Sequence, residues 1–468
     1  MLNAITYKDI YLSLPGFLYI RKIKIEEWPG KHGTMYVEAV MTEETDKFAF
    51  YEIPETVSVN YRDYGTEQIL FKGVISHKSL EAWGKYQVLK IQAKDATYWM
   101  DIDRKNRCFQ DTSRTVADIM GEIMNGYEKN DSICNIPDEP VGELLFQYEE
   151  TDWEFLNRLL SKYHECLYPS AVYPTIHYQA GVSVQEEVVD WDRLPYRKRK
   201  DFGRLEDLKQ NGFDSLLSAN FTVYDLESYD VVSLGSQIPY KGRSWYVSGI
   251  KRRLKDGLLI NYYELRQKES MLRERYYNFR LTGTSAYAIV ADTKRDRVQA
   301  IMQDEALGER CYWFPFSSVS SSSDGSGWYC MPEKGESVRL YFPTEKEREV
   351  YVITCIQSHA PTGADDPMGN PAVRSISTAT ENLVQFTKDG ILIEAKKGGA
   401  KVSLGKEGEV CVFAPEGIDL SPEIKCSFGT KAMDCEAAVS LRLKDDAGAG
   451  VIAGPAGMFL NGQEIYEN

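Results

Sequence analysis

Residues 146–170 read FQYEETDWEFLNRLLSKYHECLYPS, and this stretch decides how the rest of the chain is interpreted. Phe146 and Tyr148 alternate with polar neighbours, which is typical of the end of a strand. Thr151 is followed three residues later by Glu154, and this spacing is that of a capping box. We therefore expect a strand that passes into a helix at Thr151.

The expected helix carries one broad apolar stripe. Its members recur at helical spacing and are Trp153, Phe155, Leu156, Leu159, Leu160 and Tyr163. A stripe of this width buries against a neighbouring element. Asp152 and Glu154 fall in the first turn, where the helix dipole favours negative charge. The acids of the stretch are therefore interpreted as capping and solvated residues, and not as a catalytic cluster.

The sequence offers few residues for metal binding or acid–base chemistry. His164 and Cys166 lie close together, but a structural zinc site needs four ligands with recognisable spacing. The nine cysteines are scattered without a C-x-x-C pair, and the chain has five histidines. No catalytic residue, metal site or cofactor is therefore predicted. An odd number of scattered cysteines indicates reduced thiols, and we expect synthesis in the cytoplasm.

Length and composition set further limits. The chain has 468 residues, which predicts several domains, and its formal charge of −15 argues against tight non-specific binding to nucleic acid. It contains no run of 18 apolar residues, so no membrane-spanning helix is predicted. The N-terminal MLNAITYKDI lacks the basic start and apolar block of a signal peptide, so we expect no signal peptide.

The pattern along the chain predicts a mainly β protein with a helical insert. Short alternating runs separated by turn residues fill residues 1–100 and return in residues 169–274, which is typical of barrels or sandwiches. Residues 101–168 carry the helical insert. About five short strands in residues 275–358 fit an OB-fold-like barrel. Residues 359–374 are rich in Pro and Gly and are interpreted as a linker.

The basic run YRKRK at residues 196–200 stands out within the second β region. Acidic residues flank it on both sides, so it is interpreted as a solvated loop. Contact with an anionic surface is the alternative interpretation.

Residues 375–468 show a different pattern. Apolar residues recur nine positions apart, at Val384, Ile393, Val402, Cys411 and Leu420. The same interval separates Cys426 from Cys435 and Val451 from Leu460. A nine-residue period is too short to wrap a full coil, so we expect several chains to close a β-helix or prism together. The sequence therefore predicts an obligate oligomer.

The order of barrel, helical insert, barrel, OB-like unit and β-prism resembles the hub–spike proteins of contractile injection machines. That family includes the VgrG spike of type VI secretion and the late-control hub proteins of contractile phage tails. The most specific match is FQYEETDWEFLNRLL, with signature positions at Gln147, Tyr148, Glu150, Thr151, Asp152, Phe155, Arg158 and Leu159. The segment GWYCMPEKGESVRLYF at 327–342 is similar to the family's OB domain, with matches at Pro332, Glu333 and Gly335.

The resemblance implies a fold and a function. It implies two similar hub barrels, so that a homotrimer presents six barrels to a sixfold inner tube and ends in an intertwined trimeric β-helix spike. The implied partners are the inner tube protein, baseplate proteins, a small PAAR-like cap protein and, on injection, the envelope of the target cell. The implied role is structural and not enzymatic. Phage tail, tailocin and secretion system remain alternative settings, each an assembled injection particle.

Two other functions compete with this one. A tail-associated peptidoglycan hydrolase needs two carboxylates at a defined separation, one of them with a raised pKa, and no segment isolates such a pair. Nucleic-acid binding by the OB-like unit would use Tyr312, Trp313 and Phe314 for stacking. The segment CYWFPF has the pattern of a packed strand instead, and the chain is acidic.

The last segment, GVIAGPAGMFLNGQEIYEN, contains strand-forming residues but no cluster of His or Cys that would bind a metal at an apex. Open strands at the end of a prism leave unpaired backbone groups. The resemblance implies that a separate protein covers this tip. We expect Val451, Met458, Phe459 and Leu460 to form the surface that binds it.

Overall fold

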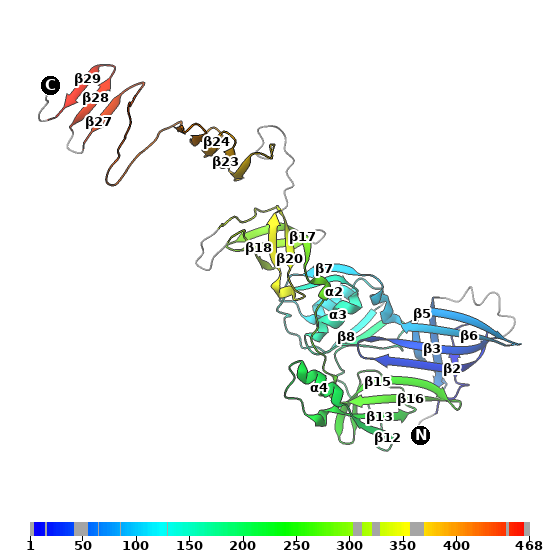
Figure 1. Cartoon of the computed structure of the whole chain (residues 1–468). Coiled ribbons are helices and arrows are strands. Elements are labelled where there is room, and N and C mark those ends of the chain that lie inside the picture. The colour runs from blue at the N-terminus through cyan, green and yellow to red at the C-terminus, as the bar shows by residue number, and fades with distance from the viewer. Residues whose placement is uncertain are drawn as a thin grey trace. The chain divides into compact units, whose positions relative to one another are not determined.

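The computed structural model describes residues 4–14, 16–41, 55–63, 65–84, 86–128, 130–302, 311–320, 328–355, 369–445 and 449–462. The chain divides into two compact units, Met1–Ser358 and His359–Asn468 (Figure 1). Strands outnumber helices throughout the described residues, so the chain is mainly β, as predicted.

Strands from both β regions of the first unit form one continuous sheet. Its order is β1-β4-β5-β6-β3-β2-β15-β16-β13-β12, and β14 pairs with β15. The bounds are β1 (Ile10–Leu12), β2 (Phe17–Trp28), β3 (Lys31–Met41), β4 (Thr56–Asp63), β5 (Thr66–Trp83), β6 (Tyr86–Asp95), β12 (Tyr196–Lys200), β13 (Thr222–Ser228), β14 (Gln237–Tyr240), β15 (Arg243–Lys255) and β16 (Leu258–Arg266). The pattern of the sequence did not predict that the two β regions share a sheet.

The two halves of this sheet join where β2 pairs antiparallel with β15 (Figure 1). A buried ion pair between Glu27 and Arg252 crosses the joint, and each side chain is at most 2% exposed. Arg252 also donates to the Val232 carbonyl at 3.1 Å. Removing either charge would leave the other buried without a partner, so this pair fixes the register of the joint.

The N-terminal segment curls the sheet back on itself. The Tyr7 N–H donates to the Gly257 carbonyl at 2.8 Å, and the Leu259 N–H donates to the Ile5 carbonyl at 2.8 Å. Thr6 forms a β-bridge with Leu258. These contacts join the residues before β1 to the hairpin between β15 and β16. One face of the sheet therefore faces the interior of the first unit.

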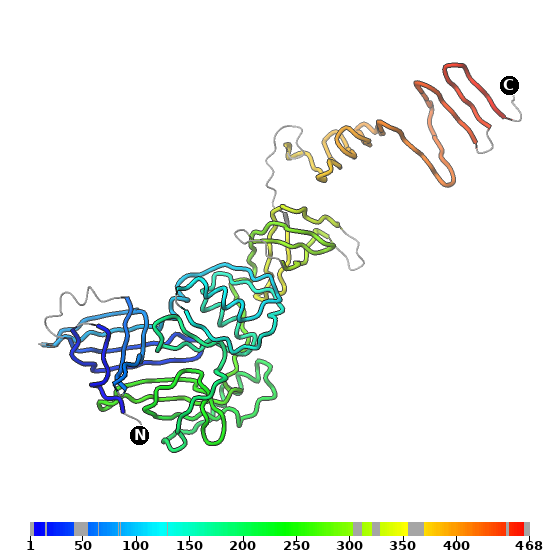
Figure 2. The backbone as a smooth tube through the Cα atoms, turned by 180° about the vertical axis from the view of Figure 1, so that it is seen from behind, coloured from blue at the N-terminus to red at the C-terminus, as the bar shows by residue number. Residues whose placement is uncertain are grey.

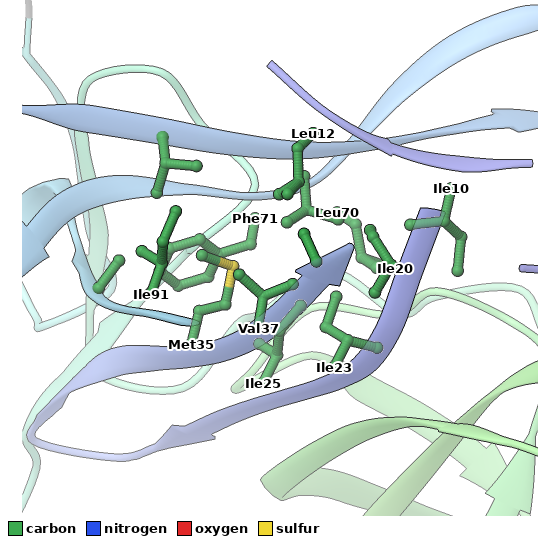
Figure 3. Close-up of a cluster of buried hydrophobic side chains, with 14 of the residues drawn as sticks. Ile10, Leu12, Ile20, Ile23, Ile25, Met35, Val37, Leu70, Phe71 and Ile91 are labelled. Carbon is green, nitrogen blue, oxygen red and sulfur yellow. The ribbon is translucent and has the colours of Figure 1, made fainter. Parts of the chain in front are cut away.

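The inward face of the first half packs into an aliphatic core. Buried residues alternate with more exposed ones over most of β2 and β3, as expected for strands with one solvated face. In Figure 3, Ile25, Val37 and Phe71 point toward one another, and each is 0% exposed. Each fully buried side chain of this size contributes about 1.5–3 kcal/mol to folding.

The basic run at 196–200 is strand β12, so the prediction of a loop is wrong. Its backbone pairs antiparallel with β13, from Tyr196 opposite Leu226 to Lys200 opposite Thr222. It lies at one edge of the large sheet, and its side chains are mostly exposed. Basic side chains on an edge strand oppose unwanted pairing with other strands.

The helical insert is built from short elements. These are η2 (Ala96–Asp101), β7 (Lys105–Phe109), α2 (Val116–Met124), β8 (Asn130–Cys134), β9 (Leu145–Glu150), α3 (Asp152–Ser161), β10 (Leu167–Pro169) and β11 (Ile176–Ala180). Both α-helices begin with a full capping box, formed at Thr115 and at Thr151. Strands β7 and β9 pair with each other, and β10, β11 and β8 form a second small sheet. Four further short helices are α4 (Phe202–Gln210), η3 (Ser218–Phe221), α5 (Lys268–Met271) and η4 (Phe279–Leu281).

The last part of the first unit is a small barrel of five strands. They are β17 (Thr284–Lys294), β18 (Arg297–Met302), β19 (Trp313–Pro315), β20 (Ser337–Phe342) and β21 (Tyr351–Cys355), in the order β19-β18-β17-β20-β21. A parallel bridge between Phe316 and Val352 brings the two edge strands together. Phe314 is 0% exposed and packs in the core, as expected for a packed strand.

The second unit consists of two antiparallel meanders. The first contains β22 (Arg374–Ser377), β23 (Leu383–Thr387), β24 (Gly390–Glu394), β25 (Lys401–Gly405) and β26 (Val410–Phe413), and the second contains β27 (Leu441–Lys444), β28 (Gly450–Gly454) and β29 (Gly457–Asn461). Figure 2 shows the successive hairpins of the first meander in orange. Residues 359–368 of the predicted linker lie outside the described residues, as do residues 321–327 and 463–468.

The register confirms part of the nine-residue repeat. Val384 pairs with Ile393, and Ile393 pairs with Val402. Val402 then pairs with Val412 and not with Cys411, because this last interval is ten residues long. The predicted repeat is therefore wrong at position 411. Val451 does pair with its counterpart nine residues later, while Leu420, Cys426 and Cys435 lie outside the strands of the described residues.

Asp95, the last residue of β6, is a fully buried carboxyl group close to the joint of the sheet. Its oxygens accept the N–H groups of Gly33 at 2.5 Å and Thr97 at 3.0 Å. Burial raises the pKa of Asp95 to about 6, and the nearby charge of Glu27 acts in the same direction. Because this folded-state pKa lies above that of an unfolded aspartate, the folded chain binds the proton more tightly. Asp95 therefore adds stability below about pH 4, and this contribution is lost as the pH rises through about 6.

We expect Asp95→Asn to remove this pH dependence. Between pH 7 and pH 5, the wild-type free energy of unfolding should rise relative to that of the variant by about 1 kcal/mol. Denaturant unfolding of both proteins at a series of pH values measures the difference. A constant difference over this range would contradict the assignment.

Candidate functional site

The signature stretch lies where the helical insert meets the small barrel. Strand β9 ends at Glu150, Thr151 caps α3, and the helix continues to Ser161. The Thr151 hydroxyl accepts the Glu154 N–H at 3.1 Å and donates to an oxygen of Asp101 at 2.6 Å. The turn between strand and helix is thereby fixed from both sides.

Asp152 is the centre of a buried polar cluster. It is 0% exposed, and its carboxylate accepts hydrogen bonds from Lys105 at 2.6 Å, Arg107 at 3.1 Å, Tyr127 at 2.6 Å and Gln147 at 3.0 Å. Burial acts to raise the pKa of Asp152, but the hydrogen bonds from Lys105, Tyr127 and Gln147 outweigh it and hold the pKa below its usual range. The side chain is therefore a buried anion with a complete set of donors.

Arg158 forms a second buried cluster on the same helix. Its guanidinium makes two hydrogen bonds to the Glu150 carboxylate, at 2.7 and 2.8 Å, and donates to the Phe146 carbonyl at 3.0 Å. It also pairs with Glu347, which belongs to the short helix η5 (Glu347–Glu349) of the small barrel. All three charged side chains are at most 5% exposed. One arginine therefore links the insert to the barrel.

Aromatic packing and backbone hydrogen bonds support the same junction. The rings of Phe146 and Phe342 are stacked, with centroids 4.9 Å apart, and Phe342 ends strand β20 of the barrel. Asn278 donates to the Tyr148 carbonyl at 2.7 Å, and Gln110 donates to the Ala300 carbonyl at 3.0 Å. The junction is thus held by a buried ionic contact, by a ring pair within shared apolar packing, and by separate hydrogen bonds.

The structure brings most of the predicted signature residues together. Gln147, Phe155 and Leu159 are buried, and Phe155 stacks on Phe109 with centroids 5.3 Å apart. The prediction that the acids are solvated is wrong for Glu150 and Asp152, because basic side chains distant in sequence cover both of them. It holds for Glu149 and for the half-exposed Glu154.

The second signature segment lies at the other end of its strand. Gly335 adopts a φ of 92°, which favours glycine, and its N–H donates to the Val290 carbonyl at 2.9 Å. The Glu333 N–H donates to Glu336 at 2.9 Å, and Pro332 is buried beside this turn. These residues shape the entry into β20, and Phe342 at its far end reaches the junction.

The sequence did not reveal the partners of the buried acids. Lys105 and Arg107 lie on β7, opposite Glu150 and Gln147 of β9. Their two-residue spacing was a usable signal, because it places both on one face of a strand. Glu347 carries no such signal, since its contact with Arg158 joins positions 189 residues apart.

The expected tip residues occupy the second meander. Val451, Met458 and Leu460 share one face of the sheet, because Val451 pairs with Leu460 and Ala453 pairs with Met458. Phe459 pairs with Ile452 and lies on the opposite face. The four residues therefore do not form a single surface on this sheet.

The remaining candidates have structural contacts. His164 lies 2.9 Å from the Arg273 carbonyl, and Cys166 is a buried thiol. Among the described residues, no three His, Cys, Asp or Glu side chains are placed to share a metal ion. None of the described helices is long and apolar enough to cross a membrane.

Sequence comparison identifies no family for this chain. No curated protein matches the sequence, and a family model described as the Alg8 N-terminal domain matches residues 55–166, which is less than half of the chain. That match begins just before β4 and ends just before β10, so it cuts through the continuous sheet and the insert.

Solved structures share the fold at low sequence identity. The E. coli protein c3393, described as a component of the type VI secretion system with structural similarity to T4 bacteriophage tail proteins gp27 and gp5, matches with a TM-score of 0.52 and 12% identity, over 74% of this chain and 99% of that chain. A chain of the Francisella PdpA-VgrG complex in its half-lidded form matches with a TM-score of 0.50 and 10% identity, over 88% and 89%. A chain of the lidless PdpA-VgrG complex matches with a TM-score of 0.51 and 8% identity, over 84% and 93%.

We expect Arg158→Met to destabilise the chain strongly, because it leaves Glu150 and Glu347 buried without a cation. Loss of one partner from a buried ionic cluster costs about 3–5 kcal/mol. Arg104→Met is the matched control, since Arg104 pairs with Glu154 at the surface and such pairs contribute about 0–1 kcal/mol. Denaturant unfolding of both variants measures the costs, and similar small values for the two would contradict a role for the buried cluster.

Proposed function

We propose that this chain is the structural hub and spike of a contractile injection machine, acting as a trimer. The fold shared with c3393 and with the PdpA-VgrG chains supports the general type of protein. The observation that carries the proposal is the second unit, which has regular sheets but no core of its own. Not one described residue between 369 and 462 is buried.

One face of the first meander in that unit is apolar except at its start, where Arg374 pairs with Phe386. Paired residues of an antiparallel sheet share a face, and residues two apart along a strand do so as well. The register therefore places on one face Ile376, Val384, Phe386, Ile391, Ile393, Val402, Leu404, Val410 and Val412. The opposite face is mixed and includes Gln385, Glu394, Lys401 and Ser403. A sheet of this kind is stable only when another layer covers its apolar face.

Identical copies of the same sheet are the simplest cover. In the proposed trimer, three meanders turn their apolar faces inward and form a prism, and the mixed faces meet the solvent. Each buried Val, Ile, Leu or Phe adds about 1.5–3 kcal/mol, which is enough to hold three chains together. The first unit of each chain then forms the hub that joins the spike to the inner tube.

The proposed partners follow from this role. They are the inner tube protein, baseplate proteins, a small cap protein at the tip and the envelope of the target cell during injection. The particle is a phage tail, a tailocin or a secretion system. The role has no catalytic step, and a zymogram with peptidoglycan tests that part, because cleared substrate would overturn it.

We expect Ile393→Asp to abolish the trimer, because it places a charge in the centre of the apolar face. Leu392→Asp is the matched control, since Leu392 is the adjacent residue but lies on the mixed face opposite Gln385 and Ser403. Sedimentation velocity measures the mass of each protein. A stable folded monomer of the wild-type chain would overturn the proposal, and so would equal loss of the trimer in both variants.

Deletion of residues 451–468 removes β28 and β29 but leaves the first meander intact. We expect the truncated chain to form trimers and to join the tube, and to lose the protein that caps the tip. Mass spectrometry of purified particles, with full-length particles as the control, identifies the proteins that remain. Full-length particles that carry no additional protein at the apex would contradict the prediction.

A further inference from the structure

A small pocket lies beside the joint of the large sheet. Its volume is about 330 Å³, which is at the lower end of the range for small-molecule sites. The walls come from the hairpin between β2 and β3, from β15 and β16, from the start of α4 and from the end of α5. Trp28, Pro29 and Met271 form its apolar part. None of the functions proposed above uses this pocket.

The lining of the pocket has an excess of positive charge. Four of its side chains are basic and two are carboxylates. Both carboxylates are already paired with Arg266, which donates to Asp201 at 2.8 Å and to Glu264 at 2.6 Å. In a chain with a formal charge of −15, this pocket is a local concentration of cations.

Lys31, Arg204 and Arg273 are the lining cations that these two carboxylates do not neutralise, and the two arginines are the less exposed ones. Arg204 donates to the Leu272 carbonyl and reaches Glu274, outside the pocket, at 3.2 Å. Arg273 donates to the Pro29 carbonyl at 3.1 Å, and no carboxylate in the described part of the chain pairs with it. Burial lowers the pKa of Arg204, and the positive charge of Arg273 lowers it further. Two partly buried guanidinium groups that repel each other favour an anion between them.

Tyr168 supplies a further polar group. It lines the pocket and is 2% exposed, and its hydroxyl forms a side-chain hydrogen bond with the thiol of Cys166. A thiol is a weak hydrogen-bond partner, so this buried hydroxyl keeps capacity for a stronger one.

We propose that this pocket binds a small anion that carries a carboxylate or phosphate group, held between Arg204 and Arg273. Guanidinium groups match both anions through paired N–H donors. The Tyr168 side chain lines the same pocket. The apolar wall of Trp28 and Met271 lowers the local dielectric constant and strengthens the charge–charge attraction. The anion then bridges α4 and the segment after α5, and Arg273 links this contact to the Pro29 carbonyl beside the joint of the sheet.

The test uses the full-length wild-type assembly in a low-salt buffer. Inorganic phosphate and citrate are titrated by calorimetry and by thermal unfolding, with sodium chloride at matched ionic strength as the reference. We expect saturable binding of at least one anion and a rise in the unfolding temperature that chloride does not reproduce. Equal effects of all three salts would overturn the proposal, because they would show general screening only.

Substitutions then locate the site. We expect Arg273→Gln and Arg204→Gln each to weaken binding at least tenfold, while Arg193→Gln, an exposed arginine outside the pocket, leaves it unchanged. Arg273→Lys keeps the charge and serves where the glutamine variant does not fold, and it should weaken binding to a smaller extent. Unchanged affinity in folded Arg204 and Arg273 variants would overturn the proposal. Sedimentation in the same buffers reports the trimer separately, so failure of the anion site is distinct from failure of the spike model.

Discussion

One buried arginine ties the small barrel to the helical insert. Arg158 lies between Glu150 of the insert and Glu347 of the barrel, and none of the three side chains is more than 5% exposed. Two buried carboxylates destabilise a fold unless a cation pairs with them. Arg158 therefore stabilises the chain only when the insert and the barrel occupy their observed positions. The capped turn at Thr151 makes the contact possible, because it fixes the direction in which α3 leaves β9. Strand β9, helix α3 and the small barrel therefore meet at one buried cluster of charges.

The sequence predicted the local parts of this site and missed the distant ones. The capping box and the apolar stripe of α3 were readable because their residues lie within one or two helical turns. Burial of Asp152 was not readable, because Lys105 and Tyr127 reach it from other elements. The pairing of β2 with β15 joins residues more than 200 positions apart. The alternation of buried and exposed residues within a strand is the same whichever strand pairs with it, so this alternation does not identify the neighbour. The predicted nine-residue repeat is wrong at Cys411, because the interval from Val402 to its partner Val412 is ten residues.

The two units obtain their stability in different ways. The first unit has five clusters of buried apolar residues, and the buried charges of Glu27, Asp152 and Arg158 are paired within it. The described part of the second unit has no buried residue, although its strands are regular and correctly alternating. Hydrogen bonds between strands do not by themselves compensate for the entropy lost when a chain is ordered. The second unit therefore needs contacts from outside itself, while the first does not.

The distribution of residues over the two faces of the second unit's first meander limits what those contacts are. Ile393 and Val402 lie on the apolar face, and Glu394 and Lys401 lie opposite each other on the mixed face. An apolar face on one side only requires a cover on that side and leaves the mixed face to the solvent. It fits a closed prism, where each sheet contributes one face to the interior and one to the solvent. The free thiol of Cys411 falls on the mixed face, opposite Ser403, and the apolar face carries a charged side chain at its start, Arg374, which pairs with Phe386.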